Sequence, residues 1–280
     1  MKLSQRIALG YIRTKLKLLS TISKKKAAQK AFTLFCTPQR RHKRALPDIF
    51  KQAENLTLRI GGYQVRGWRW NHPGSRKVMI IHGFESASAN FDRYVKPLTR
   101  KGYEVLAFDA PGHGYSSGKR ITAPLYRDMI RAVHEVYGPV ESYMAHSFGG
   151  LAVCLALEEI SHTDQFRLVL IAPATETSTA IGSFFRFLQL DDDTRKEFDK
   201  LIIKAGGVSP GWYSIRRAMQ HIRARVQWYH DEDDDTTPVS DVLKVQADNH
   251  PNIEFIITKG LGHRRIYREN KVTRAVTAFL

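Results

Sequence analysis

The chain has 280 residues, of which 42% are hydrophobic and 25% charged, which excludes the low-complexity and disordered classes. The formal net charge of +17 suggests nucleic-acid binding, but the charge is unevenly distributed. Of the 44 lysines and arginines, 13 lie in residues 1–44, which contain no acid, so the other 236 residues carry 31 basic and 27 acidic side chains. The basic character therefore belongs to an N-terminal arm, and nucleic-acid binding by the globular part is not expected.

The arm has the pattern of a basic amphipathic helix. Apolar residues recur at helical spacing between lysines and arginines, at Leu3, Ile7, Tyr11, Leu18, Leu19 and Ile22. Such a helix can lie on an anionic membrane, so residues 1–44 are a candidate for peripheral membrane contact. The same helix can pack on its own domain with a solvated basic face, and both interpretations stay open. The cluster RRHKR, residues 40–44, is interpreted as a solvated linker rather than an RNA site.

The sequence gives few signs of export, membrane insertion or cofactor binding. No apolar run in the arm has the length of a signal peptide or a membrane span. Cys36 and Cys154 are far apart and match neither a metal site nor a redox motif, so a disulfide framework is not expected. We expect a cytoplasmic protein, with peripheral attachment to a membrane left open, and we expect no metal or organic cofactor.

From about residue 54, short β-type runs alternate with helix-length segments. The runs cover residues 56–60, 63–70, 77–83, 103–109, 142–146, 167–173, 225–231 and 253–258. The first two can form an antiparallel hairpin across Gly61 and Gly62. The later runs are short and almost continuously apolar, which is typical of parallel strands buried on both faces and joined by helices. The predicted class is therefore α/β with a mainly parallel sheet.

One interval is longer than a single crossover requires. About fifty residues separate the run that ends near Pro173 from the run that begins near Arg225. We interpret residues 175–222 as a small helical cap inserted into the α/β domain of residues 54–280, which follows the arm of residues 1–53. A longer crossover is the alternative. The cap contains an apolar cluster that suggests an acyl or alkyl pocket, or that simply packs the cap, namely Phe184, Phe185, Phe187 and Leu188.

The stretch SYMAHSFGG, residues 142–150, predicts a nucleophile. A strand that ends at Ala145 or His146 turns sharply into a helix that begins near Phe148, which places Ser147 on the turn. Residues two positions away must be small where strand and helix pass in contact, and Ala145 and Gly149 meet this need. The pattern is the nucleophile elbow G-x-S-x-G, with alanine in place of the first glycine.

Three further stretches fall where a serine nucleophile requires partners. The run IIHGFES ends a strand before Phe84, whose backbone N–H is a candidate oxyanion donor together with that of Phe148. The strand 225–231 ends in a cluster of acids, and His263 follows the last strand. The chain order is therefore Ser, Asp, His, in which histidine is the general base and the acid fixes its tautomer.

These motifs together resemble the α/β-hydrolase superfamily, over about residues 54–280. The stretch FDAPGHGYSSG, residues 108–118, is similar to the family's D-x-P-G-x-G-x-S loop, and HG, HSFGG and LGH lie in the family order. The resemblance implies a sheet of about eight mostly parallel strands with helices on both faces and a small helical cap. It also implies Ser147 as nucleophile and His263 as base, whereas His82, His113 and Asp109 more often order turns in such loops.

The acid of the triad has more than one candidate in this sequence. The family motif G-x-x-D-x-x-x-P, counted back from Pro238, selects Asp234 and leaves Asp231 where glycine is usual. Asp233 and Asp235 stay open as alternatives.

The resemblance implies a serine hydrolase that cleaves a carboxylic ester or thioester with an apolar group through an acyl-enzyme. The expected partner is thus a small-molecule ester or thioester. The alternative is a catalytically idle protein that binds a membrane or a partner through the basic arm.

Overall fold

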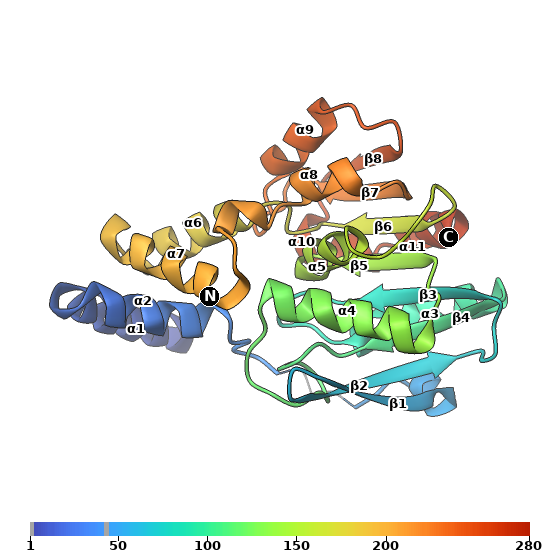
Figure 1. The fold of residues 1–280 in the computed structure, drawn as a ribbon, viewed down its shortest axis with the longest axis horizontal. Helices are drawn as coiled ribbons and strands as arrows, with labels where there is room; N and C mark the ends of the chain where they lie inside the picture. Colours follow the sequence, from blue (N-terminus) through green and yellow to red (C-terminus); the bar gives the residue numbers. More distant parts are fainter. Residues whose placement is uncertain (1–2, 42–44) are drawn as a thin grey trace. The chain divides into compact units, whose positions relative to one another are not determined.

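The computed structural model describes residues 3–41 and 45–280, and Figure 1 shows a twisted β-sheet with helices on its faces. Its eight strands lie in the order β1-β2-β4-β3-β5-β6-β7-β8. The bounds are β1 Glu54–Ile60, β2 Tyr63–Trp70, β3 Arg76–Ile81, β4 Tyr103–Phe108, β5 Ser142–His146, β6 Arg167–Ile171, β7 Arg225–Asp231 and β8 Ile253–Thr258. Every predicted strand is therefore present, within a few residues of its predicted ends.

The sheet combines an antiparallel hairpin at one edge with a run of parallel strands. β1 and β2 form the predicted antiparallel hairpin, closed where Ile60 pairs with Tyr63, and β2 is also antiparallel to β4. From β4 to β8 all neighbouring strands are parallel. All residues of β4 and β5 are buried, as expected for strands covered by helices on both faces. The carboxyl ends of the parallel strands consequently lie at one edge of the sheet, where open α/β sheets bind ligands.

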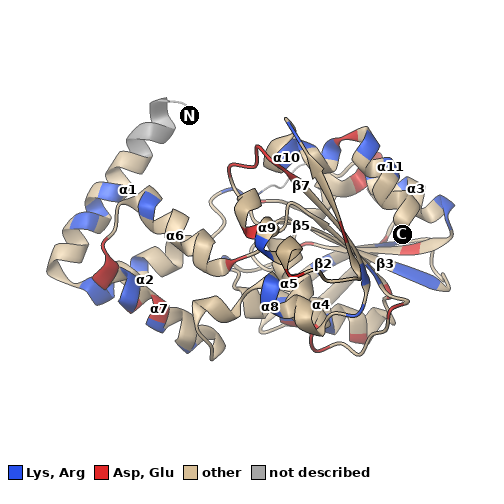
Figure 2. Cartoon of the chain, turned by 90° about the horizontal axis from the view of Figure 1, so that it is seen from above, with Lys and Arg blue, Asp and Glu red and all other residues tan. Residues whose placement is uncertain are grey.

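Helices cover both faces of this sheet. Figures 1 and 2 show α3 and α11 on one face, and α4, α5 and α8 on the other. The bounds are α3 Asp92–Arg100, α4 Ala123–Tyr137, α5 Phe148–Leu157, α8 Ile215–Ala218, α9 Val239–Ala247, α10 Gly262–Arg265 and α11 Asn270–Phe279, with short 3₁₀ turns η1 Asp48–Gln52, η2 Ser88–Phe91, η4 Met219–His221 and η5 Ile266–Arg268. The predicted mostly parallel, helix-covered fold is confirmed.

Local sequence explains where these helices begin and which side they bury. In α4 the N-cap Thr122 accepts a hydrogen bond from Leu125 N at 3.3 Å, which satisfies one free N–H of the first turn. The buried residues of α4 recur at helical spacing and are Tyr126, Met129, Ile130 and Val133. In α5, by contrast, every residue after Phe148 is buried, which identifies it as a central core helix.

The chain divides into two compact units, and each is described here by itself. The unit that holds the sheet consists of Pro38–Thr175 and Ser214–Leu280. The other, called the helical unit below, combines the described residues up to Thr37 with Glu176–Tyr213. Its helices are α1 Leu3–Ile22, α2 Lys24–Phe35, α6 Thr177–Leu188 and α7 Asp192–Gly206, with the turn η3 Pro210–Trp212. The described part of the arm up to Thr37 and most of the insertion thus build one body, while the predicted boundaries at residues 53, 175 and 222 remain predictions.

The helical unit has a small core in which alanines of α2 face phenylalanines of the insertion. Ala28 and Ala31 are fully buried against Ile181, Phe185 and Phe198. Small side chains on α2 allow α6 and α7 to approach closely enough for edge-to-face ring contacts, such as Phe185 to Phe198 at 5.1 Å.

This core decides between the two interpretations of the apolar cluster in the insertion. Phe185 and Leu188 are buried and Phe184 packs against the core, so three of the four residues stabilise the unit rather than line an open pocket. Phe187 alone is exposed, at 49%.

A polar contact also joins α1 to the start of α7. Asp191, the N-cap of α7, accepts hydrogen bonds from Ser20 Oγ at 2.6 Å and from Lys24 Nζ at 2.8 Å, besides the capping bond from Thr194 N. Ser20 itself is buried, at 4% exposure. The inward face of the arm therefore packs on its own chain.

Residues 42–44 of the predicted linker, and residues 1–2 of the candidate membrane contact, lie outside the described residues. Among the described residues, no helix combines the length and apolar character that crossing a bilayer requires.

Candidate active site

Ser147 lies on a sharp turn between β5 and α5. Its backbone has φ 55° and ψ −125°, a left-handed conformation that is strained for any residue with a Cβ. Strand β6 and the loop that follows it hold this turn, because Ser147 N donates to Ile171 O at 3.1 Å and Ala174 N donates to Ser147 O at 3.0 Å. Hydrogen bonds thus hold both the N–H and the C=O of the strained serine, and the sharp turn has the local geometry predicted for a nucleophile elbow.

The small residues around Ser147 are required by close approach of the backbone. A Cβ added at Gly149 would lie 2.5 Å from His82 O and 2.8 Å from Ile81 Cγ2, and one added at Gly150 would lie 2.6 Å from Pro173 Cβ. Ala145 is fully buried. Strand β3 and helix α5 therefore meet at Gly149, where no side chain fits.

We expect Gly149→Ala to destabilise the fold by about 1–3 kcal/mol, because backbone atoms of β3 must move to admit the methyl group. Differential scanning calorimetry measures this loss. Gly10→Ala is the matched control, since nothing lies within 4 Å of its new Cβ and α1 gains a better helix former. Equal melting temperatures for Gly149→Ala and the wild type would contradict the close approach.

His263 and Asp234 join Ser147 in one hydrogen-bonded line. His263 Nε2 lies 2.9 Å from Ser147 Oγ, and His263 Nδ1 lies 2.8 Å from Asp234 Oδ2. Ser147 and His263 are each 8% exposed and Asp234 is 7% exposed. The three residues come from the ends of β5 and β7 and from the turn after β8, so the parallel sheet brings together groups far apart in the sequence.

The surroundings keep Asp234 ionised. Burial acts to raise the pKa of Asp234, but hydrogen bonds from His263 and from the N–H groups of Thr236 and Thr237 outweigh it and lower the pKa to about 2. Thr237 Oγ1 adds a further bond to Asp234 Oδ2 at 2.8 Å. A carboxylate fixed in this way holds a proton on Nδ1 of His263 and leaves Nε2 as the acceptor facing Ser147.

The other acids of the cluster have different positions. Asp231, where the family motif has glycine, is buried and accepts from Thr258 Oγ1 at 2.7 Å, Leu261 N at 3.0 Å and Gly262 N at 2.9 Å. It therefore fastens the turn that carries His263, a role that the sequence did not reveal. Asp233 accepts from Gly260 N at 3.0 Å, and Asp235 is exposed.

The backbones of the two predicted oxyanion residues lie close to the serine. A Cβ at Gly83, directly before Phe84, would lie 2.8 Å from Ser147 Cβ, so the turn after β3 passes next to the nucleophile. Phe148 is the first residue of α5, where N–H groups have no partner inside the helix. The rings of Phe84 and Phe148 are only partly buried and meet edge to face at 6.2 Å.

Sequence reasoning did not assign a role to His146, the residue before the serine. Its ring is buried beside His263, at 4.8 Å between ring centroids, and its Nε2 lies 3.0 Å from His263 O. Burial lowers the pKa of His146 to about 3, so the ring is neutral and Nε2–H can donate to that carbonyl. His146 thereby restrains the backbone of His263. The position of His146 next to Ser147 in the sequence does not indicate this contact with His263, which is 117 residues away.

Two more buried histidines order the turns around the site. His82 Nε2 accepts from Ala110 N at 2.9 Å, and His113 Nε2 accepts from Glu85 N at 3.2 Å, so both rings must be neutral at this nitrogen. Asp109 accepts from Ser88 N and Tyr115 N, each at 2.8 Å. Within the described residues, no group of three metal-binding side chains is placed to hold a metal ion.

These histidines predict a loss of stability in mild acid. Burial lowers the pKa of His82 to about 4 and that of His113 to about 3, below the usual value of 6.5. Their contribution is complete above pH 6.5, where both states are neutral, and falls as the pH drops towards 4, because the unfolded chain then binds more protons. Each histidine should contribute a slope of up to about 1.4 kcal/mol per pH unit. Urea unfolding at several pH values measures the slope, and an equal slope in His113→Gln would contradict the assignment.

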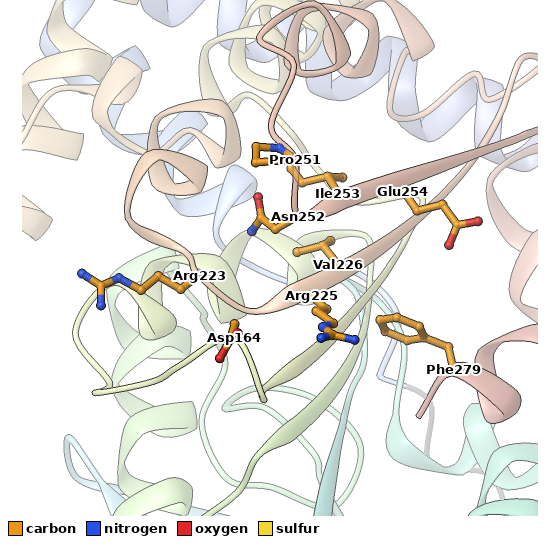
Figure 3. A pocket seen from close by; sticks show the side chains of 9 residues that line it. All are labelled: Asp164, Arg223, Arg225, Val226, Pro251, Asn252, Ile253, Glu254 and Phe279. Atoms are coloured by element: carbon orange, nitrogen blue, oxygen red, sulfur yellow. The ribbon is translucent and has the colours of Figure 1, made fainter.

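One cavity of the structure adjoins the candidate site, and another lies far from it. A cavity of about 320 Å³ adjoins His263 and includes Arg264 and Thr236 in its lining. Another, of about 420 Å³, is shown in Figure 3 and is lined by residues such as Arg225 and Ile253, which begin β7 and β8. The second cavity is at the amino ends of these strands, about 20 Å along β7 from the acidic turn, and does not belong to the site.

Comparison with known proteins identifies similar sequences and similar folds. The sequence model of the serine aminopeptidase (S33) family of hydrolases matches residues 73–205. A Pyrococcus furiosus esterase superposes with a TM-score of 0.64 at 20% identity, over 87% of this chain and 98% of the esterase. The chain therefore has the α/β-hydrolase fold, and its residues 73–205 are similar to that hydrolase family.

Some curated proteins with partial similarity to this chain carry the names of serine hydrolases. The chain is 29% identical to a serine hydrolase-like protein of Dictyostelium discoideum over 54% of the chain and 48% of that protein. It is 30% identical to the monoglyceride lipase of Rattus norvegicus over 37% of each chain. The matches span about half or less of the length of these relatives. The substrates of the relatives are therefore not assigned to this chain.

Proposed function

We propose that this α/β-hydrolase cleaves a carboxylic ester or thioester through an acyl-enzyme, with Ser147, His263 and Asp234 as its triad. The observation that carries the proposal is the buried line of hydrogen bonds from Ser147 Oγ to His263 and on to Asp234, at 2.9 and 2.8 Å. A serine hydroxyl becomes a useful nucleophile only when a base in this position takes its proton.

The reaction follows from the positions of these groups. His263 Nε2 takes the proton of Ser147 as its Oγ attacks the carbonyl carbon, and Asp234 stabilises the imidazolium that forms. The negative oxygen of the tetrahedral intermediate is accepted by the backbone N–H groups of Phe84 and Phe148. His263 then protonates the leaving alcohol or thiol, and a water molecule repeats the sequence on the acyl-enzyme to release the acid.

An apolar group on the substrate is favoured by the surroundings of the serine. The rings of Phe84 and Phe148 are partly exposed and contact each other edge to face, whereas the phenylalanines of the insertion are mostly used in the core of the helical unit. Apolar rings beside the nucleophile exclude water and bind hydrocarbon. We therefore assign the acyl or alkyl preference to these two residues.

A panel of p-nitrophenyl esters of increasing acyl length, with matched thioesters, tests the proposal. We expect hydrolysis with a preference for apolar acyl groups, and lower kcat/KM for the longer esters in Phe148→Ala. Absence of turnover on every ester and thioester would instead favour the catalytically idle binding protein.

A further inference from the structure

The outward face of α1 carries an apolar stripe that the helical unit does not use. Tyr11, Leu18 and Ile22 are 66%, 61% and 80% exposed and follow one another at spacings of seven and four residues, so they lie on one side of the helix. The inward side carries Leu16 and Ser20, which are buried. The stripe extends over about 16 Å of helix.

Positive charge accompanies this stripe without matching acids. Lys15 is on the same side of α1, with its Nζ 5.7 Å from the centre of the Tyr11 ring. Lys25 and Lys26 follow Ile22 at the start of α2 and are exposed. Within the described part of the chain, none of the three lysines has an acidic partner, whereas Lys24 pairs with Asp191. Figure 2 shows basic residues along α1 and α2, and neither helix contains an acid.

The lysines at the start of α2 oppose the local stability of that helix. The first turn of a helix carries partial positive charge and favours acids, but α2 begins with Lys24, Lys25 and Lys26 and has no acid in its first turn. A sequence that breaks a local rule in this way is typical of a functional position. An anionic surface next to this turn would remove the conflict, since helix N-termini attract anions.

We propose that the outward face of α1 with the first turn of α2 docks on an anionic lipid bilayer. Tyr11, Leu18 and Ile22 enter the boundary between headgroups and acyl chains, and Lys15, Lys25 and Lys26 contact the lipid phosphates and carboxylates. A second copy of this chain is a poorer occupant, because two such lysine-rich faces repel each other. Nucleic acid would use the lysines but leaves the apolar stripe without a role.

Full-length variants test the proposal better than a deletion, because removal of α1 and α2 would uncover the core residues Phe185 and Phe198. Sedimentation with phosphatidylcholine vesicles, with and without phosphatidylserine, measures binding. We expect binding that requires phosphatidylserine and weakens as salt rises from about 0.1 M to about 1 M, where the Debye length falls from ~10 to ~3 Å.

Two groups of variants separate charge from apolar insertion. Replacing Lys15, Lys25 and Lys26 by glutamine should weaken binding about fivefold per lysine, or about a hundredfold together. Leu18→Ser with Ile22→Ser should weaken it about tenfold for each side chain. The matched control replaces three exposed lysines of α7 by glutamine and should bind nearly as the wild type does, at Lys196, Lys200 and Lys204.

Three results would overturn the proposal. One is a wild type that does not bind phosphatidylserine vesicles, or that binds a DNA oligomer instead. Another is an equal loss in both lysine triples, which would indicate net charge alone. The third is a mass in light scattering that doubles with concentration and returns to the monomer in Leu18→Ser with Ile22→Ser, which would make the stripe an interface between copies. Ester hydrolysis should be equal in all these variants, so the readout is independent of the proposed triad.

Discussion

Ser147→Ala should lower kcat on a p-nitrophenyl ester by about 10⁴- to 10⁶-fold while the fold is retained. The hydroxyl is the only group of the proposed triad that bonds to the substrate, so neither His263 nor Asp234 can replace it. Alanine keeps a Cβ, and the turn stays in the same strained conformation. Steady-state kinetics on protein with unchanged circular dichroism measures the effect.

Ser147→Gly is the matched control for this substitution. Glycine adopts φ 55° without strain, so Ser147→Gly should be more stable than Ser147→Ala by about 1 kcal/mol, while both variants lack activity. Residual activity near that of the wild type in either variant would mean that another group performs the attack.

Asp234→Asn should reduce kcat by about 10⁴-fold with little effect on KM. The amide can donate a hydrogen bond to Nδ1 of His263, which places the proton on Nε2 and removes the acceptor that faces Ser147. The carboxylate is also lost as the stabiliser of the imidazolium. The comparison of kcat with KM separates this loss from a weaker fit of the substrate.

The neighbouring acids provide controls that identify the triad acid. Asp235→Asn should leave kcat close to that of the wild type, because Asp235 is exposed. Asp231→Asn should cost about tenfold, since an amide replaces one of the oxygens that hold Leu261 N and Gly262 N ahead of His263. If Asp234→Asn were as active as Asp235→Asn, the assignment of Asp234 would be wrong.

The fold could be predicted from local patterns because each buried strand is short, apolar and bounded by turn residues. The runs at 142–146 and 225–231 match β5 and β7 residue for residue. Parallel pairing then requires the ends of these strands to meet at one edge, which explains why Ser147, Asp234 and His263 converge although up to 116 residues separate them.

The arrangement of the arm could not be predicted, because it depends on contacts that no local pattern encodes. The amphipathic spacing of α1 indicates a helix but not which chain segment covers it. Ala28 and Ala31 accept Phe185 and Phe198, more than 150 residues away, only through complementary size. The roles of His146 and Asp231 were missed for a similar reason, since each acts on the distant turn of His263.

Covalent labelling tests the central claim, an activated Ser147, most directly. The protein is treated with a fluorophosphonate and its intact mass is measured, for the wild type, Ser147→Ala and His263→Ala. We predict one adduct on the wild type, mapped to Ser147, none on Ser147→Ala, and strongly slowed labelling of His263→Ala. A wild type that stays unlabelled, or a Ser147→Ala variant labelled as fast as the wild type, would contradict the account.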